Sequence, residues 1–246
     1  MNTHSYDTLF VADVDNTILK NWDGWDFLIR AVSKALYGIE FGMLKKPDGS
    51  KDRSFGKKTT SEIWRERLVQ VGLDPDDEDE GLFYRTLDAQ GSMMDFYGKA
   101  ERFGGVITLL GSLRRVSIHP IRLLSTGMRG IQSKVIRDLN LTAQFDLAGS
   151  LFYGECASKA DGLSKLSGHV RPRVLAYIGD APSDMTALKQ AASDAGRRIA
   201  VGVTVAGLST AEELLHAGAD YLIQSYDTAT IRGLTSLVAR SQSAIE

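Results

Sequence analysis

Residues 9–18 read Leu-Phe-Val-Ala-Asp-Val-Asp-Asn-Thr-Ile, so a short apolar run leads directly into two aspartates spaced two apart. The four apolar residues at 9–12 are too few for a helix and predict a buried strand, which the polar residues after it interrupt. If the strand continues by two residues, Asp13 and Asp15 point to the same face. Two buried carboxylates so close together need a cation between them or a proton on one of them. A divalent metal with one nucleophilic and one protonated carboxyl group suits phosphoryl transfer, and a solvated acidic turn is the alternative.

The composition is that of an ordinary globular protein, with 246 residues, 43% hydrophobic and 24% charged. The net charge of −2 provides no electrostatic surface for nucleic acid or an anionic membrane, so neither partner is expected. A single cysteine, Cys156, excludes an internal disulfide and a cysteine-built zinc site, and fits a reducing compartment. The first residues lack the pattern of a signal peptide, and no apolar run reaches the roughly 18 residues of a membrane span. We therefore expect a cytoplasmic protein.

The region 20–100 shows helical rather than strand periodicity. Apolar and aromatic residues recur at helical spacing in 20–45, 63–71 and 82–97. A polar loop is predicted at 45–58, and the acidic run 74–80 is interpreted as a solvated helix start rather than a metal loop. This region therefore predicts an all-helical insert.

From about residue 105 onward, short apolar strands alternate with helices. Strands are predicted at 121–124, 174–178, 199–205 and 221–223, with a short strand or loop at 145–151, and helices at 106–113, 130–139, 161–166, 184–195, 210–217 and 228–239. Such alternation is typical of a parallel sheet with both faces covered, to which the strand at 9–12 also belongs. The prediction is an α/β, Rossmann-like core of residues 1–19 and 101–246 with a helical domain at 20–100. Ligands in such sheets bind at the carboxyl ends of the strands.

Chemically useful side chains follow the predicted strands. The second strand ends in Ser125 and Thr126, whose hydroxyls could bind an oxyanion or could simply cap a helix. Lys159 lies in a turn before a helix, and Asp180 and Asp184 follow the strand at 174–178. Each signal is weak separately, but together with the first aspartates they supply a nucleophile, an acid, anion-binding groups and a metal site.

At this point the chain resembles a phosphatase of the haloacid dehalogenase superfamily, and the resemblance covers the whole chain. Four motifs of that superfamily occur in order: Asp-x-Asp-x-Thr at Asp13, Asp15 and Thr17; a strand-end hydroxyl at Ser125 or, with a less suitable spacing, Thr126; a lysine at Lys159 or, less suitably, Lys165; and Gly-Asp-x-x-x-Asp at Gly179, Asp180 and Asp184.

Features outside these motifs resemble the phosphoglycolate phosphatase-like branch. The helical insert after the first motif is similar to an α-helical cap. Residues 55–60 with Ile63, and residues 201–203, 212–214 and 218–220, are similar to segments of that branch. Asn16 departs from the glycine that is commoner there, but asparagine tolerates the same backbone region.

The resemblance implies a magnesium-dependent hydrolysis of a small phosphorylated metabolite. Asp13 would be the nucleophile that forms an aspartyl-phosphate, and Asp15 the general acid and then the base. The implied Mg²⁺ ligands are Asp13, the backbone carbonyl of Asp15, and Asp180, with Asp184 in or beside the coordination shell. Ser125, or Thr126 in its place, and Lys159 would bind the phosphoryl oxygens.

Other activities of the same scaffold remain open. A dehalogenase would need neither Asp15 nor Asp180, whereas a phosphomutase would share every core residue. A phosphonate hydrolase would need a Schiff-base lysine, for which Lys57 and Lys58 are candidates, although both are interpreted as solvated loop charges. A non-catalytic binding protein is a further alternative. Lys57 and Thr59 are also the candidate specificity residues, while the substrate and the oligomeric state stay open.

Overall fold

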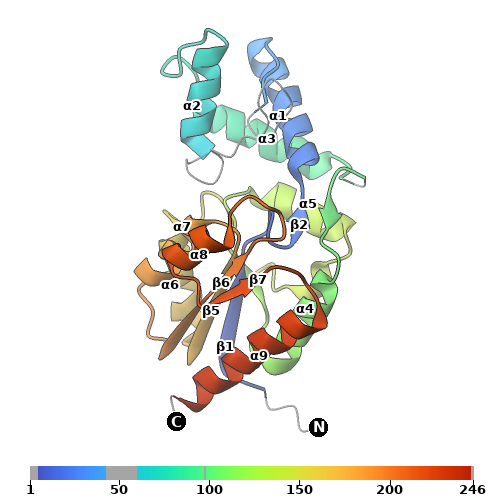
Figure 1. Cartoon of the computed structure of the whole chain (residues 1–246). Coiled ribbons are helices and arrows are strands. Elements are labelled where there is room, and N and C mark those ends of the chain that lie inside the picture. The colour runs from blue at the N-terminus through green and yellow to red at the C-terminus, as the bar shows by residue number, and fades with distance from the viewer. Residues whose placement is uncertain (1–4, 43–59, 97, 245–246) are drawn as a thin grey trace. The chain divides into compact units, whose positions relative to one another are not determined.

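The computed structural model describes residues 5–42, 60–96 and 98–244 (Figure 1). The chain divides into two compact units. Unit 1 comprises Met1–Lys20, Arg102–Arg129 and Asn140–Glu246, and unit 2 comprises Asn21–Glu101 and Gly130–Leu139. Two short strands, β2 (Leu19–Lys20) and β3 (Glu101–Arg102), pair in a sheet of their own.

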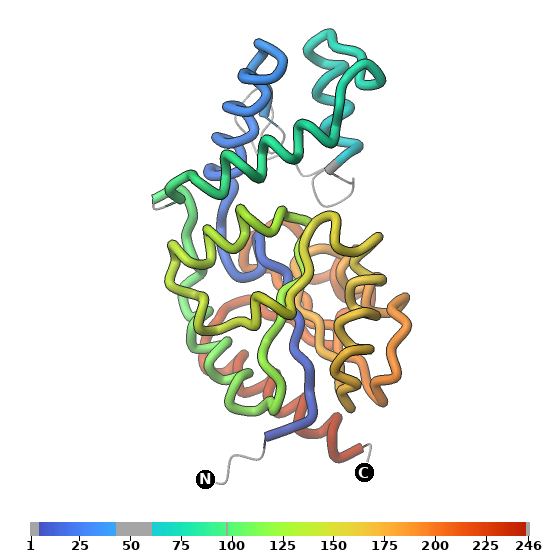
Figure 2. The backbone as a smooth tube through the Cα atoms, turned by 180° about the vertical axis from the view of Figure 1, so that it is seen from behind, coloured from blue at the N-terminus to red at the C-terminus, as the bar shows by residue number. Residues whose placement is uncertain are grey.

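Unit 1 is built on a five-stranded sheet in the order β4-β1-β5-β6-β7. Its strands are β1 (Thr8–Ala12), β4 (Arg122–Leu123), β5 (Val174–Gly179), β6 (Arg197–Val203) and β7 (Tyr221–Ile223). Every neighbouring pair is parallel, which confirms the predicted α/β core. Figure 2 shows β1 in blue beside the green segment that contains β4. The carboxyl ends of β1, β4 and β5 therefore meet at one edge of the sheet.

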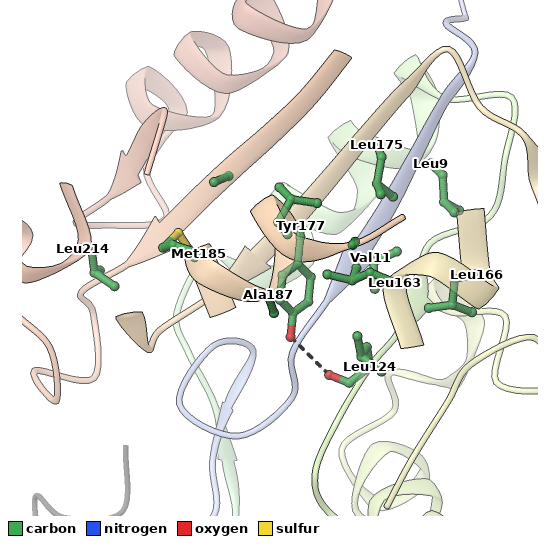
Figure 3. Packing of buried hydrophobic residues seen from close by; sticks show 13 residues of the cluster. Leu9, Val11, Leu124, Leu163, Leu166, Leu175, Tyr177, Met185, Ala187 and Leu214 are labelled. Atoms are coloured by element: carbon green, nitrogen blue, oxygen red, sulfur yellow. Dashed lines mark hydrogen bonds between the residues drawn. The ribbon is translucent and has the colours of Figure 1, made fainter. Parts of the chain in front are cut away.

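Helices cover both faces of this sheet, which explains why β1 and β5 are continuous apolar runs rather than alternating ones. On one face lie α6 (Lys159–Val170), α7 (Pro182–Gln190) and α8 (Ala211–Ala217), and on the other α4 (Val106–Val116) and α9 (Thr228–Ser243). A short 3-10 helix, Thr142–Gln144, follows α5 (Arg129–Asp138). The core beneath α6 and α7 joins leucines of both helices to side chains of β1 and β5 (Figure 3).

The chain turns after β1 earlier than predicted. β1 ends at Ala12, so the argument that Asp13 and Asp15 share one face of a continuing strand is wrong. The backbone N–H groups of Ile18 and Leu19 both donate to the Val14 carbonyl, at 2.9 and 3.3 Å. Asn16 adopts the left-handed conformation (φ 63°), which asparagine tolerates better than most residues. A tight turn therefore carries Asp15 instead of the strand.

Two further helices, α6 and α7, each begin two residues before their predicted starts. Ser158 caps α6 by accepting the N–H of Asp161 at 3.1 Å, so Lys159 is the first helical residue rather than part of a preceding turn. Pro182 begins α7 at a position where its missing N–H costs nothing, and Asp184 lies within the first turn. The end of α7 at Gln190 is earlier than the predicted residue 195.

Unit 2 contains α1 (Trp22–Tyr37), α2 (Thr60–Gln70), α3 (Glu80–Met93) and most of α5. Its core is aromatic, with the rings of Tyr37, Phe41 and Phe83 stacked at 6.0–6.3 Å. Residues 130–139 belong to this unit, and Asp88 of α3 accepts the N–H of Ile131 at 3.1 Å. Asp79 caps α3 by accepting the N–H of Leu82 at 2.8 Å, which confirms the acidic run as a helix start. The assignment of residues 20–100 as a substrate-selecting cap stays a prediction.

No helix within the described ranges combines the length and the apolar character that crossing a membrane requires.

Candidate active site

Four charged side chains from separate parts of the sequence converge at the carboxyl edge of the unit 1 sheet. Asp13, Asp180 and Asp184 each place a carboxylate oxygen within 4.8 Å of the other two. The ammonium group of Lys159 lies 3.0 Å from Asp13 Oδ2 and 2.5 Å from Asp184 Oδ1. The three carboxylates are almost inaccessible to solvent, with exposed fractions of 8%, 6% and 0%.

The sheet positions the first two carboxylates. Parallel pairing of β1 with β5 places Asp13 beside the end of β5, where its backbone N–H donates to the Ile178 carbonyl at 2.8 Å. Asp180 follows β5 directly, and its Oδ1 accepts the Thr17 hydroxyl at 3.2 Å. The Thr17 carbonyl in turn accepts the buried hydroxyl of Tyr226. The turn after β1 is therefore tied both to Asp180 and to the C-terminal segment.

The position of the third carboxylate, that of Asp184, depends on the absence of a side chain at Gly179. A Cβ atom at residue 179 would lie 2.3 Å from Asp184 Oδ2, so a side chain there would displace the Asp184 carboxylate. Asp184 Oδ2 accepts the N–H of Ala181 at 3.1 Å, while Oδ1 accepts both Lys159 and the Tyr177 hydroxyl. Asp184 is thus the most fully hydrogen-bonded of the three carboxylates.

Burial and mutual repulsion make this cluster electrostatically costly. Burial, reinforced by the charges of Asp184 and Asp15, raises the pKa of Asp13 to about 7, although Lys159 opposes the shift. Burial and the charge of Asp13 raise the pKa of Asp180 well above its usual value. Burial alone would lower the pKa of Lys159, but the charges of Asp13 and Asp184 outweigh it and raise that pKa, so the lysine stays charged.

The donor set fits a hard divalent cation. It offers three buried carboxylates, and Lys159 is the cation that the structure pairs with two of them. Oxygen ligands with an excess of negative charge suit Mg²⁺ better than a thiolate- or imidazole-preferring metal. Asp13 and Asp180 would serve as ligands, because protein donors already hold both oxygens of Asp184.

The remaining predicted residues occupy different surroundings. Asp15 is half-buried in the turn after β1, close enough for its charge to raise the pKa of Asp13. Ser125 is buried, and its Oγ accepts the N–H of Gly127 at 3.0 Å, whereas Thr126 is exposed. Lys165 pairs with Asp161 at 2.8 Å on the surface of α6 and is not among the converging groups. Lys57, Lys58 and Thr59 lie outside the described residues.

Sequence reasoning missed two residues that support this site, Tyr177 and Arg129. Tyr177 contacts Asp184, and the one available signal was a tyrosine inside an otherwise aliphatic strand. Arg129 forms a bidentate ion pair with Glu155, with N–O distances of 2.5 and 2.8 Å. It also donates to the backbone carbonyls of Leu147 and Ser150. This arginine holds the segment before α6 against the start of α5, a connection between distant residues that carries no local pattern.

Comparison with solved structures identifies the architecture. A haloacid dehalogenase-like hydrolase from Streptococcus pneumoniae superposes with a TM-score of 0.64 at 18% sequence identity, covering 96% of this chain and 100% of that one. The chain has the haloacid dehalogenase-like fold. A predicted phosphatase from Clostridium acetobutylicum (TM-score 0.61, 16% identity, 96% and 99% covered) and a predicted phosphoglycolate phosphatase from Haemophilus somnus (0.63, 15%, 96% and 99%) share this fold.

No protein-family model matches the sequence, and no curated protein matches it either. The solved structures confirm the resemblance seen in the sequence motifs at the level of the haloacid dehalogenase-like fold.

We expect Mg²⁺ to stabilise the protein more at pH 8 than at pH 5.5. Because the pKa of Asp13 is about 7, a proton competes with the metal for this carboxylate at the lower pH. Thermal unfolding with and without 10 mM MgCl₂, at constant ionic strength, measures the difference. Asp180→Asn serves as the variant that should lose most of the shift, and an equal shift at both pH values would contradict the assignment of Asp13 as a ligand.

Proposed function

We propose that this chain is a magnesium-dependent phosphatase that hydrolyses a small phosphate monoester, of the phosphoglycolate phosphatase-like type, through an aspartyl-phosphate on Asp13. The observation that carries the proposal is the convergence of Asp13, Lys159 and Asp180. A buried carboxylate stands there beside a fixed ammonium group and a second acid, at the edge of the sheet where ligands bind. The haloacid dehalogenase-like fold supports the reaction class.

In the first step, a carboxylate oxygen of Asp13 attacks the phosphorus atom as the bond to the leaving alcohol breaks. Asp15 gives its proton to the leaving oxygen, so the product departs as a neutral alcohol. Lys159 is positioned to offset charge on the phosphoryl oxygens, and the hydroxyl of Ser125 adds a donor from the end of β4. Asp184 holds Lys159 in place, since its Oδ1 lies 2.5 Å from the ammonium nitrogen.

In the second step, Asp15 accepts a proton from water, and the water oxygen attacks the phosphorus of the aspartyl-phosphate. The bond to Asp13 breaks, which releases inorganic phosphate and restores the carboxylate. Each proton that Asp15 gives in the first step is thereby recovered in the second.

The proposed ligands of Mg²⁺ are Asp13, Asp180 and the backbone carbonyl of Asp15, with Asp184 beside them. When bound, the ion would neutralise the acids and draw charge from the transferring phosphoryl group.

Asp15→Asn should lower kcat for an alkyl phosphate by about 10²–10⁴-fold, the usual contribution of acid–base catalysis. The loss in kcat/KM, which reports the first step, should be smaller for p-nitrophenyl phosphate, because nitrophenolate leaves without protonation. Steady-state kinetics on both esters measures the contrast. Asp23→Asn, on unit 2, provides a matched control, and a loss below about threefold on the alkyl ester would remove Asp15 from this role.

The proposed function is tested with a panel of phosphorylated metabolites, with Mg²⁺ and with EDTA. The panel includes phosphoglycolate, sugar phosphates and nucleotides, and the measured product is inorganic phosphate. Magnesium-dependent release from at least one ester supports the proposal. Isomerisation of a sugar phosphate without net release would identify a phosphomutase, and borohydride-sensitive cleavage of a phosphonate would identify a Schiff-base hydrolase. Failure of every compound to react would favour a binding protein.

A further inference from the structure

Tyr177 is a polar side chain in the centre of the sheet. Strand β5 reads Val-Leu-Ala-Tyr-Ile-Gly, and every residue in it is buried. Tyr177 has no exposed surface, and it packs among the aliphatic side chains beneath α6 and α7 (Figure 3). Burying a phenol hydroxyl is unfavourable unless it finds a hydrogen-bond partner. The partners of this hydroxyl therefore decide what the residue does.

The hydroxyl reaches two acceptors that belong to different parts of the site. It lies 3.2 Å from Asp184 Oδ1 and 3.5 Å from the carbonyl oxygen of Leu124, the residue before Ser125. The contact with Leu124 is drawn in Figure 3. The aromatic ring also lies beneath Lys159, with the ammonium nitrogen 5.9 Å from the ring centroid. One tyrosine thus contacts the end of β4, the lysine of α6 and the carboxylate of α7.

A phenol has one proton to donate, and the carboxylate is both the nearer and the stronger acceptor. The oxygen that accepts it, Asp184 Oδ1, is also the oxygen that Lys159 contacts at 2.5 Å. Burial and the charge of Asp184 raise the pKa of Tyr177, so the hydroxyl remains a donor at all working pH values. The oxygen around which Lys159 is arranged is therefore held from a second direction.

We propose that Tyr177 is a positioning residue that fixes the Asp184 carboxylate and thereby directs the ammonium group of Lys159 toward Asp13. This inference rests on the proposed phosphatase function, in which Lys159 stabilises the transferring phosphoryl group. It assigns to β5 a role beyond packing. Lys159 lies between two carboxylates, 3.0 Å from Asp13 and 2.5 Å from Asp184. If Asp184 loses one of its donors, the lysine is drawn further toward it and away from the reacting oxygen.

Tyr177→Phe tests this inference, because it removes one oxygen atom and keeps the ring that packs in the core. Tyr221→Phe is the matched control: Tyr221 lies on β7, separated from β5 by β6, and its hydroxyl donates to the Thr230 carbonyl at 2.8 Å. Both variants lose one buried or half-buried hydroxyl, but only the first loses a contact with the site. The measurements are kcat and KM for p-nitrophenyl phosphate, inhibition by orthovanadate with Mg²⁺ present, and thermal unfolding.

We expect Tyr177→Phe to lower kcat by about 10-fold or more, the effect of losing a hydrogen bond to a charged group, with KM changed less than about threefold. Orthovanadate, which resembles the transition state, should bind more weakly by a similar factor. Tyr221→Phe should keep the kcat of the wild type. Tyr177→Met, which keeps a flexible apolar side chain at this position without a hydroxyl, should reproduce the loss in kcat.

Two results would overturn the inference while the proposed function stands. One is an active wild type whose Tyr177→Phe variant keeps kcat and orthovanadate inhibition within twofold. The other is unfolding of both the Phe and the Met variants, which would make Tyr177 a structural residue only. A wild-type protein that neither hydrolyses the ester nor binds orthovanadate with Mg²⁺ would reject the proposed function and this inference together.

Discussion

Asp13→Asn is expected to abolish turnover while the protein stays folded. Asparagine has the shape of aspartate but supplies no anionic oxygen to attack phosphorus, so no aspartyl-phosphate can form. The expected loss exceeds that of any other single substitution at the site, because Asp13 is the group that forms the proposed covalent intermediate and the other side chains only assist its reaction. Phosphate release from the best ester of the panel measures the residual activity, and Asp194→Asn, at an exposed position of unit 1, is the control.

Asp13→Asn should also change the stability of the folded protein, in a direction that depends on pH. The pKa of Asp13 is about 7 in the folded protein and about 4 in an unfolded chain, so the folded state holds the proton more tightly. Because its pKa is raised, Asp13 makes a stabilising contribution that is fully present below about pH 4 and is lost as the pH rises through 7. Without Mg²⁺ at pH 8, the uncharged asparagine should therefore make the protein more stable than the wild type.

Urea unfolding at pH 5 and pH 8, without metal, measures this effect. Equal stability changes at the two pH values would mean that Asp13 does not lie in the repulsive cluster. Hydrolysis at the wild-type rate by the purified variant would reject Asp13 as the nucleophile.

Much of the α/β core could be predicted from the sequence because its signals are local. The strands at 9–12 and 174–178 are buried on both faces of the sheet. Such strands are nearly continuous apolar runs, which can be recognised in the sequence. The parallel order of the strands then brings their carboxyl ends together, so Asp13 and Asp180 could be assigned to one site before any distance was known. The same reasoning anticipated Lys159 and Asp184.

Other features could not be predicted because they depend on tertiary contacts. The turn at 14–19 ends β1 early, since its carbonyl at Val14 accepts two N–H groups, and a two-residue spacing of acids does not reveal this. The bond between Thr17 and Asp180 joins residues 163 positions apart. Tyr177 shows the same limit: a tyrosine in an apolar strand looks like core until its hydroxyl is placed 3.2 Å from Asp184.

The second large effect is expected from Lys159→Met, which removes the cation and keeps most of the side chain's length. Asp13 and Asp184 then face each other and Asp180 without a positive partner, although all three remain buried. Removing one partner of a buried ion pair typically costs about 3–5 kcal/mol of unfolding free energy. Turnover should fall at least as far as in Asp15→Asn, because the transferring phosphoryl group loses its fixed positive charge.

The loss of unfolding free energy in Lys159→Met should depend on pH, in a direction that follows from the charges around Lys159. The raised pKa of Lys159 keeps it charged in the folded wild type across pH 5–8, so its stabilising contribution is present throughout that range. In the variant, the carboxyl groups lose the ammonium group that lowers the pKa of Asp13, so they bind protons more readily. Protonation at pH 5 relieves the repulsion, and the difference from the wild type should therefore grow as the pH rises to 8.

Urea unfolding of Lys159→Met and the wild type at pH 5, 6.5 and 8 measures this difference, with Lys165→Met as the control on the exposed surface of the same helix. Mg²⁺ should recover part of the lost stability at pH 8, because a divalent ion can replace the missing charge, but it should not recover turnover, because it cannot occupy the position of the ammonium group beside Asp13 Oδ2. A variant whose stability deficit is constant with pH, or whose activity Mg²⁺ restores, would show that Lys159 is neither the counter-charge of these acids nor a phosphoryl-binding group.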